Sequence, residues 1–202
     1  MVGLRERKKQ QTRQEIFEAS QRLFMRRGFD AVTVAQIADE ANVSEMTVFN
    51  YFATKEDLFY AGMRFFEEEL VEAVRHRPRG ESALKAFQRR VVEGASSLAE
   101  KARTDAIAGA GKIVASSQSL QARERQIVDE YTVRLAELLP GDVEAKVAAA
   151  TMMAVHRALV AYVRARVAAG RRGAGLAADY RAQARRAFGR LDRGLGDYAV
   201  KA

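Results

Sequence analysis

The stretch VSEMTVFNYFATKEDLF, residues 43–59, carries two helix starts with a very short helical segment between them. Ser44 and Thr54 favour the N-cap position, where a side-chain oxygen accepts a backbone amide. The segment between them, residues 45–52, has only about two turns, and an isolated helix of that length is marginal in water. We therefore predict that neighbouring helices hold this segment in place.

The helical period divides the residues of this short segment between two faces. At about 100° per residue, one face carries Val48, Tyr51 and Phe52, which are expected to pack on neighbouring helices. The opposite face carries Met46, Thr47 and Asn50, and Phe49 lies at its margin. Glu45 falls in the first turn, where a negative charge stabilises the helix start.

Two helices are predicted before this segment. Residues 10–27 are amphipathic, and Gly28 supplies the stop. Thr33 and Gln36 then form a capping box at the start of the second helix. A three-residue turn joins that helix to segment 45–52, which is the pattern of a helix-turn-helix whose second helix enters the major groove of DNA. An ordinary helical hairpin with an idle exposed face is the alternative.

Composition indicates an all-α protein and limits the other classes. Nearly half of the 202 residues are hydrophobic, prolines are two, and there is no cysteine for disulfides or thiolate sites. No apolar run approaches 18 residues and no signal peptide is evident, so we expect a cytoplasmic protein without a membrane span. The sequence has only two histidines and no spacing typical of a metal site. We therefore expect neither an enzyme nor a cofactor or metal site.

The net charge of +8 is unevenly distributed. Residues 1–30 carry eight Lys/Arg against four Asp/Glu, whereas residues 31–60 carry one against five. The basic residues Arg5, Arg7, Lys8, Lys9 and Arg13 are therefore expected to meet much of the phosphate charge, as an arm along the backbone or in a minor groove. A disordered solubilising tail is the alternative.

A helix from Thr54 to Val74 connects this region to the rest of the chain, and residues 76–80 (HRPRG) interrupt the helical pattern. Further helices are predicted at about 82–102, 104–116, 119–139, 142–169 and 176–195. We place domain boundaries at 1–53 and 54–202, with 54–75 as the connecting helix.

The helix predicted at 142–169 is apolar nearly all round, with one arc of small residues. Small residues permit close helix–helix approach, so this arc and the last helix predict a four-helix interface of a homodimer. The predicted interface residues are Val147, Thr151, Ala154, Ala158, Ala161, Ala165, Tyr180, Ala184 and Phe188. A central core helix of a monomer is the alternative.

The stretch GFDAVTVAQIADEANVSEMTVFNYFATKEDLF, residues 28–59, resembles the N-terminal signature of the TetR family of bacterial repressors. The resemblance implies an N-terminal three-helix DNA-binding domain and a larger C-terminal helical domain for ligand binding and dimerisation. It also implies that Thr33, Tyr51 and Lys55 bind phosphates and that Ser44 and Thr47 cap or contact the backbone. The full predicted DNA-binding set is Arg13, Thr33, Ser44, Glu45, Met46, Thr47, Phe49, Asn50, Tyr51 and Lys55.

Some of these positions leave alternatives open. Met46 stands where the family commonly has glycine, and Phe49 where it commonly has tyrosine. Phe49 could contact a thymine methyl, and Asn50 could read adenine or bond a phosphate. Glu45 could accept from a cytosine amino group or merely stabilise the helix start.

The resemblance further implies a small-molecule effector that releases the dimer from a pseudo-palindromic operator. Weak similarity near residues 122–128 and at the C-terminal end suggests a fatty or acyl-CoA-like ligand. The candidate lining residues are Phe66, Phe87, Ile107, Ile127, Tyr131, Met152, His156 and Leu159, and for each of them an ordinary core role is the favoured alternative. A helical adaptor without sequence-specific DNA binding is the competing function, but it leaves the basic arm and the capped helix-turn-helix unexplained.

Overall fold

The computed structural model describes residues 3–62, 64–195, 198 and 200. The described residues form helices and turns, with no strand and a single isolated bridge between Ser82 and Val200. The predicted all-α class is therefore confirmed. The first unit comprises the residues up to Arg64 together with Lys112–Glu124. The second unit comprises Phe65–Gly111 and the residues from Arg125 onward. The predicted domains 1–53 and 54–202 follow a different criterion and stay a prediction.

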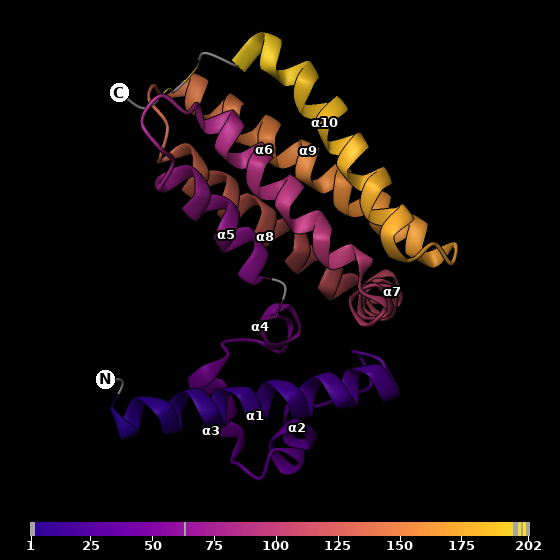
Figure 1. Ribbon diagram of the computed structural model, residues 1–202. Helices are drawn as coiled ribbons and strands as arrows, with labels where there is room; N and C mark the ends of the chain where they lie inside the picture. Colours follow the sequence, from indigo (N-terminus) through magenta and orange to yellow (C-terminus); the bar gives the residue numbers. More distant parts are fainter. Residues whose placement is uncertain (1–2, 63, 196–197, 199, 201–202) are drawn as a thin grey trace. The chain divides into compact units, whose positions relative to one another are not determined.

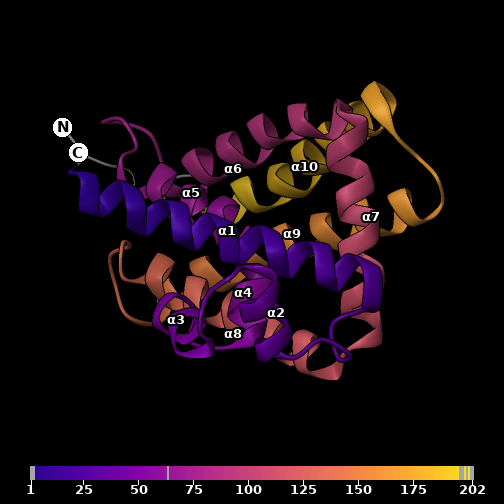
Figure 2. The same ribbon diagram turned by 90° about the horizontal axis from the view of Figure 1, so that it is seen from below.

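The first unit is built on one long helix. Figures 1 and 2 show α1 with α2 and α3 beside it, and α4 also packs on α1. The rings of Phe24, Phe29 and Phe59 form the centre of its core, with centroids 5.1–5.8 Å apart. The helices of this unit are α1 (Leu4–Arg27), α2 (Val34–Glu40), α3 (Glu45–Tyr51) and α4 (Lys55–Tyr60), joined by the end of α7 and the start of α8.

Helix α1 begins six residues earlier than the apolar periodicity predicts, at Leu4 instead of residue 10. Its first turns are rich in Arg, Glu, Lys and Gln, which have high helix propensity without any apolar face. Hydrogen bonds from Gln11 to Glu15 (2.9 Å) and from Gln14 to Glu18 (2.8 Å) add support along its exposed side. The basic residues from Arg5 onward therefore belong to a helix and not to an extended arm.

The single helix predicted from Thr54 to Val74 is two helices, α4 and α5 (Arg64–Arg75). Gly62 lies between them, and glycine disfavours helix by about 1 kcal/mol relative to alanine. A Cβ at Gly62 would meet Cζ of Phe17 at 2.9 Å, so the bare backbone permits a close approach of that ring. Met63 lies outside the described residues.

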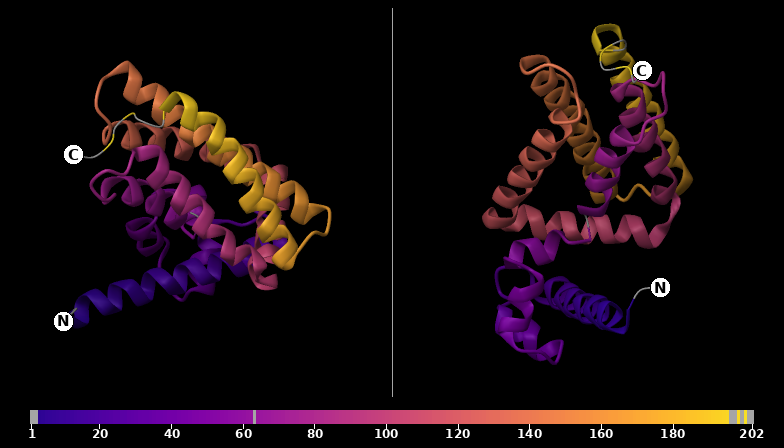
Figure 3. Two further views of the ribbon diagram at one scale, coloured as in Figure 1. Left: turned by 45° about the horizontal axis from the view of Figure 1, so that its top comes forward. Right: turned by 90° about the vertical axis from the view of Figure 1, so that its left-hand side faces the viewer.

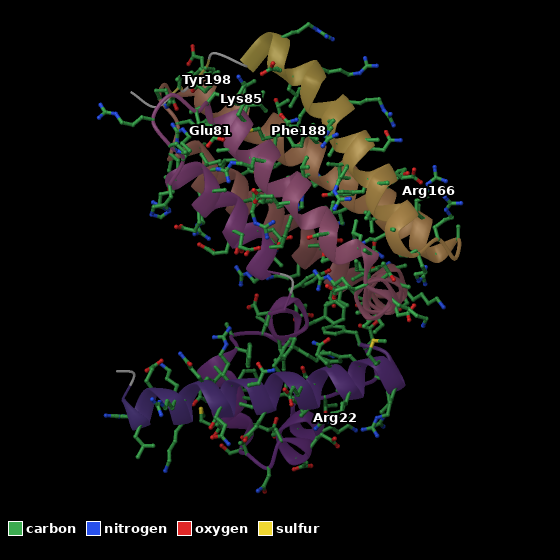
Figure 4. The ribbon with its side chains drawn as sticks, in the orientation of Figure 1. Arg22, Glu81, Lys85, Arg166, Phe188 and Tyr198 are labelled. Carbon is green, nitrogen blue, oxygen red and sulfur yellow. The ribbon has the colours of Figure 1, made fainter. Side chains whose placement is uncertain are left out.

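The second unit is a set of longer helices. Figure 3 shows α10 running along α6 and α9, and α10 also packs on the 3-10 helix η1. Phe188 points from α10 toward α6 (Figure 4), where its ring lies 6.0 Å from that of Phe87. The remaining elements are α6 (Ala83–Gly94), η1 (Ala95–Ala99), α7 (Lys101–Ser116), α8 (Gln118–Ala136), α9 (Val143–Ala168) and α10 (Gly173–Leu195).

The predicted dimer residues separate into two groups in the structure. On α9, Val147 is 55% exposed, and Ala154, Ala158, Ala161 and Ala165 are exposed beside the half-buried Thr151. On α10, by contrast, Tyr180, Ala184 and Phe188 are buried in the core of their own chain. The α10 residues that were predicted to lie in the dimer interface are therefore core residues, because the apolar stripe of α10 packs against α6, η1 and α9 of the same chain.

Helix α9 is also long and apolar enough, by length and composition, to cross a membrane. The core helix of a soluble protein passes the same test, and the face of α9 around Ala149, Met152 and His156 is buried in the second unit. The expectation of no membrane span stays a prediction.

Candidate nucleic-acid interface

The turn between α2 and α3 has a defined hydrogen-bonded geometry. Asn42 takes a positive φ of 53°, a conformation that asparagine tolerates better than most residues. The amide of Asn42 donates to the carbonyl of Asp39 (3.1 Å), and that of Val43 donates to the carbonyl of Ala38 (2.9 Å). This pair of bonds is a Schellman motif, which ends α2 and lets α3 begin two residues later.

Each of the three predicted N-caps is present. The Thr33 hydroxyl accepts from the Gln36 amide while the Gln36 side chain accepts from the Thr33 amide, both at 3.2 Å. The Ser44 and Thr54 hydroxyls accept from the amides of Thr47 (3.1 Å) and Asp57 (3.0 Å). The Ser44 cap therefore fixes the start of α3, and Glu45 is exposed in its first turn, where a negative charge also favours the helix start.

Except for Thr47, the residues of α3 lie on the predicted faces. Val48 and Phe52 are 2% and 5% exposed, and Tyr51 is half-buried. On the opposite side, Met46 is 69% and Phe49 49% exposed, and Asn50 is exposed too. Thr47 is half-buried, and its hydroxyl lies 2.8 Å from that of Ser44. A short helix anchored in the core thus presents two large apolar side chains and one amide to solvent.

A basic stripe lies on the same unit. Arg5, Lys9 and Arg13 are four residues apart on α1 and exposed, so they share one helix face. The guanidinium of Arg13 lies 4.9 Å from the centroid of the Phe52 ring at the end of α3. The stripe therefore runs toward the side of the unit on which α3 lies.

Lys55 has a structural task in addition to any contact with phosphate. Its Nζ donates to the carbonyls of Phe29 (3.0 Å) and Val32 (2.8 Å) and lies 4.2 Å from the centroid of the Phe29 ring. These contacts fasten the start of α4 to the loop between α1 and α2. The contacts predicted between DNA and Thr33, Tyr51 or Lys55 stay predictions.

The start of α8 is bonded into the first unit. Ser117 Oγ donates to Asp30 Oδ1 (2.8 Å), and Tyr60 Oη donates to the Leu120 carbonyl (3.0 Å). Arg123 donates through Nε and Nη2 to Asp57 Oδ1, at 2.9 and 2.8 Å. Burial opposes ionisation of the Asp57 carboxyl, but hydrogen bonds from Arg123 and Thr54 outweigh it and lower its pKa. Helix α8 continues from there to Ala136 in the second unit.

The predicted effector residues all lie in the second unit. Those on α6, α8 and α9 are buried, namely Phe87, Ile127, Tyr131, Met152, His156 and Leu159, whereas Phe66 and Ile107 are half-buried. Two arginines on α9 lie off its buried face, with Arg157 exposed and Arg164 half-buried. No sequence signal distinguished Glu67, whose carboxylate lies beside His156; it is the first of three consecutive acids.

Residues 16–61 match the family model described as bacterial regulatory proteins, tetR family. The chain is 35% identical over 85 residues to the HTH-type transcriptional regulator TcmR of Streptomyces glaucescens, a match that covers 42% of this chain and 38% of that one. It therefore spans well under half the length of this curated relative.

Two solved structures share the fold across nearly the whole chain. The SmeT–triclosan complex superposes with a TM-score of 0.57 at 16% identity, covering 93% of this chain and 91% of the other. FadR of Thermus thermophilus, described as a transcriptional repressor in complex with lauroyl-CoA, superposes with a TM-score of 0.51 at 20% identity, covering 87% and 92%. At these identities the likeness establishes the fold.

Proposed function

We propose that the chain, whose residues 16–61 match the family model of bacterial regulatory proteins, tetR family, is a homodimeric, ligand-responsive repressor that acts in the cytoplasm and is not an enzyme. The dimer binds a pseudo-palindromic operator with α3 in the major groove and releases it when an effector binds the second unit.

One observation carries the DNA-binding part of the proposal. Helix α3 is capped at Ser44 and anchored by Val48 and Phe52, yet leaves Met46, Phe49 and Asn50 open to solvent. Met46 and Phe49 are 69% and 49% exposed, so both side chains are open to contact with base edges in the major groove. The basic stripe of Arg5, Lys9 and Arg13 supplies the phosphate contacts that would position the helix.

The exposed stripe of small residues on α9 supports the dimer. A helix whose far side is exposed and apolar gains by pairing with a second copy, and small side chains let two such helices approach closely. A two-fold dimer would hold two recognition helices one helical turn of DNA apart, which suits a palindromic site.

The helix α8 supports a route from effector to DNA. It is continuous from Gln118 to Ala136, with Leu120 and Arg123 bonded in the first unit and Ile127 and Tyr131 buried in the second. An effector that favoured a different position of α8 would shift the dimer between binding and non-binding states. Relatives of this fold are described with triclosan and with lauroyl-CoA, so an apolar effector is consistent with them.

Substitutions on α3 test the proposal. Tyr51→Phe removes only a hydroxyl and should weaken binding to all duplexes by a similar factor, whereas Asn50→Ala should change which base is preferred at one position by about 1–3 kcal/mol. Affinities for a set of single-base operator variants measure both effects. Tyr162→Phe, the same change in the second unit, is the control. A uniform response to Asn50→Ala would remove Asn50 from base reading, and no response to either would contradict the assignment of α3.

A further inference from the structure

Two polar side chains face one another inside the second unit. His156 on α9 is 3% exposed, and its Nε2 lies 3.9 Å from Oε1 of Glu67 on α5, which is beyond hydrogen-bond distance. Among the described residues, Nδ1 of His156 and Oε2 of Glu67 are buried side-chain atoms without a hydrogen-bond partner. The pair therefore keeps one ring nitrogen and one carboxylate oxygen available within the helical bundle.

The neighbouring acids on α5 are satisfied, which sets Glu67 apart. Glu68 accepts from Nη1 and Nη2 of Arg134 at 2.7 and 2.6 Å, and this pairing lowers the pKa of its carboxyl. Glu69 is paired with Arg90. Three consecutive carboxylates thus point at three different helices, and the one directed at α9 leaves its Oε2 without a hydrogen-bond partner among the described residues.

The surroundings of the pair are mostly apolar and aromatic, and the guanidinium of Arg90 lies 4.7 Å from the centroid of the Phe66 ring. The Phe66 ring stacks on the His156 imidazole with centroids 5.6 Å apart and an interplanar angle of 27°. Met152 and Leu159, four residues before and three after His156, share its buried helix face. The site therefore joins a flat aromatic wall to two unused polar atoms.

Unsatisfied polar atoms in such a place call for a partner. A buried donor or acceptor left without one costs more than the hydrogen bond it would have made, and a charged group costs most. Buried atoms of this kind call for an explanation, and a ligand that is bound in another state is one that two such atoms on facing side chains support. An ionised carboxylate is an acceptor only, so the partner of Glu67 must be a donor.

We propose that Glu67 and His156 recognise the effector, and that the effector is a planar aromatic compound with a hydroxyl or amino donor instead of a fatty-acyl anion. The donor binds Oε2 of Glu67, a polar atom of the ligand meets Nδ1 of His156, and the aromatic body lies against Phe66. Glu67 repels anionic ligands and finds no donor in a thioester. This inference rests on the proposed function, since it names the ligand of the same regulator.

Naphthalene probes of one shape test the donor requirement. Calorimetric titration with 1-naphthol and 1-naphthylamine should give affinities about tenfold or more above those for 1-methoxynaphthalene, which keeps the shape without the donor, and for the anion 1-naphthoate. In Glu67→Met the preference should vanish while the melting temperature stays equal or rises, because the orphan carboxylate is gone. Glu72→Met, the same change at a side chain that is 41% exposed on α5, should keep the preference.

The variant Glu67→Gln provides a second test that can be used if Glu67→Met fails to fold. Its amide oxygen still accepts, but without charge, so the preference for 1-naphthol should weaken and not vanish. The inference would be overturned if the parent protein bound 1-naphthol and its methyl ether equally, bound 1-naphthoate more tightly, or bound neither donor probe. It would also be overturned if the preference for the donor probes survived in Glu67→Met. Operator binding without any probe is measured on the same samples. If it is intact, only the ligand class is wrong; if the parent protein binds no operator, the proposed function fails.

Discussion

Replacing Ala158 by glutamate is expected to raise the dimer dissociation constant by about 10³-fold or more and, as a result, to remove tight operator binding. Ala158 is exposed in the middle of the α9 stripe, between Ala154 and Ala161. In a two-fold interface the substitution places two carboxylates near the axis. Burying an unpaired charge costs several kcal/mol per ion, and every 1.4 kcal/mol is about tenfold in the equilibrium constant.

Sedimentation and operator titration measure the two consequences. Ala102→Glu puts the same charge on an exposed alanine in the first turn of α7 and should leave both quantities unchanged. The protomer of Ala158→Glu should stay folded and keep its thermal stability, because residue 158 is exposed and makes no core contact. If the variant dimerises like the parent, the α9 stripe is not the interface and a different surface must pair the two chains.

Replacing Phe188 by alanine is expected to lower the free energy of unfolding by about 3–5 kcal/mol, the usual cost of removing a buried aromatic ring. The ring is fully buried and lies 6.0 Å from Phe87, so its loss leaves a cavity between α10 and α6. Chemical denaturation of the dimer at a fixed protein concentration measures the loss. Arg190→Ala, two residues on and exposed, should change the unfolding free energy by less than about 1 kcal/mol.

The same variant separates a core role from an interface role. As a core residue, Phe188 should affect unfolding and leave the dimer dissociation constant of the folded protein nearly unchanged. A large rise in that constant with little loss of protomer stability would restore Phe188 to the predicted interface and contradict the burial described for it.

Much of the first unit could be predicted because its signals are local. The capping residues Thr33, Ser44 and Thr54 act on amides three residues away, and the faces of α3 follow from the helical period alone. The start of α1 at Leu4 was not predicted, because the first turns of this helix have no apolar face from which periodicity could be detected. The break near Gly62 was also missed, and the close approach of Phe17 to Gly62 depends on tertiary placement that no local pattern reveals.

The second unit shows where a sequence pattern becomes ambiguous. A small or apolar stripe looks the same whether it faces its own core or another chain, so Val147 and Phe188 entered one predicted surface although only the first is exposed. Lys55 was expected to bind phosphate, and its bonds to two carbonyls of the preceding loop depend on tertiary placement. The Glu67–His156 pair joins residues 89 positions apart, a spacing that no periodicity reveals.

The most direct test of the central claim, that α3 reads a specific DNA sequence, is a titration of the protein with the duplex from upstream of its own gene. A shuffled duplex of equal composition is titrated in parallel, and both are measured at two salt concentrations. We predict an affinity about 10³-fold or more higher for the upstream duplex, retained at both salt concentrations while both affinities fall with salt. Equal affinities for the two duplexes would show charge-driven binding alone and would contradict the account.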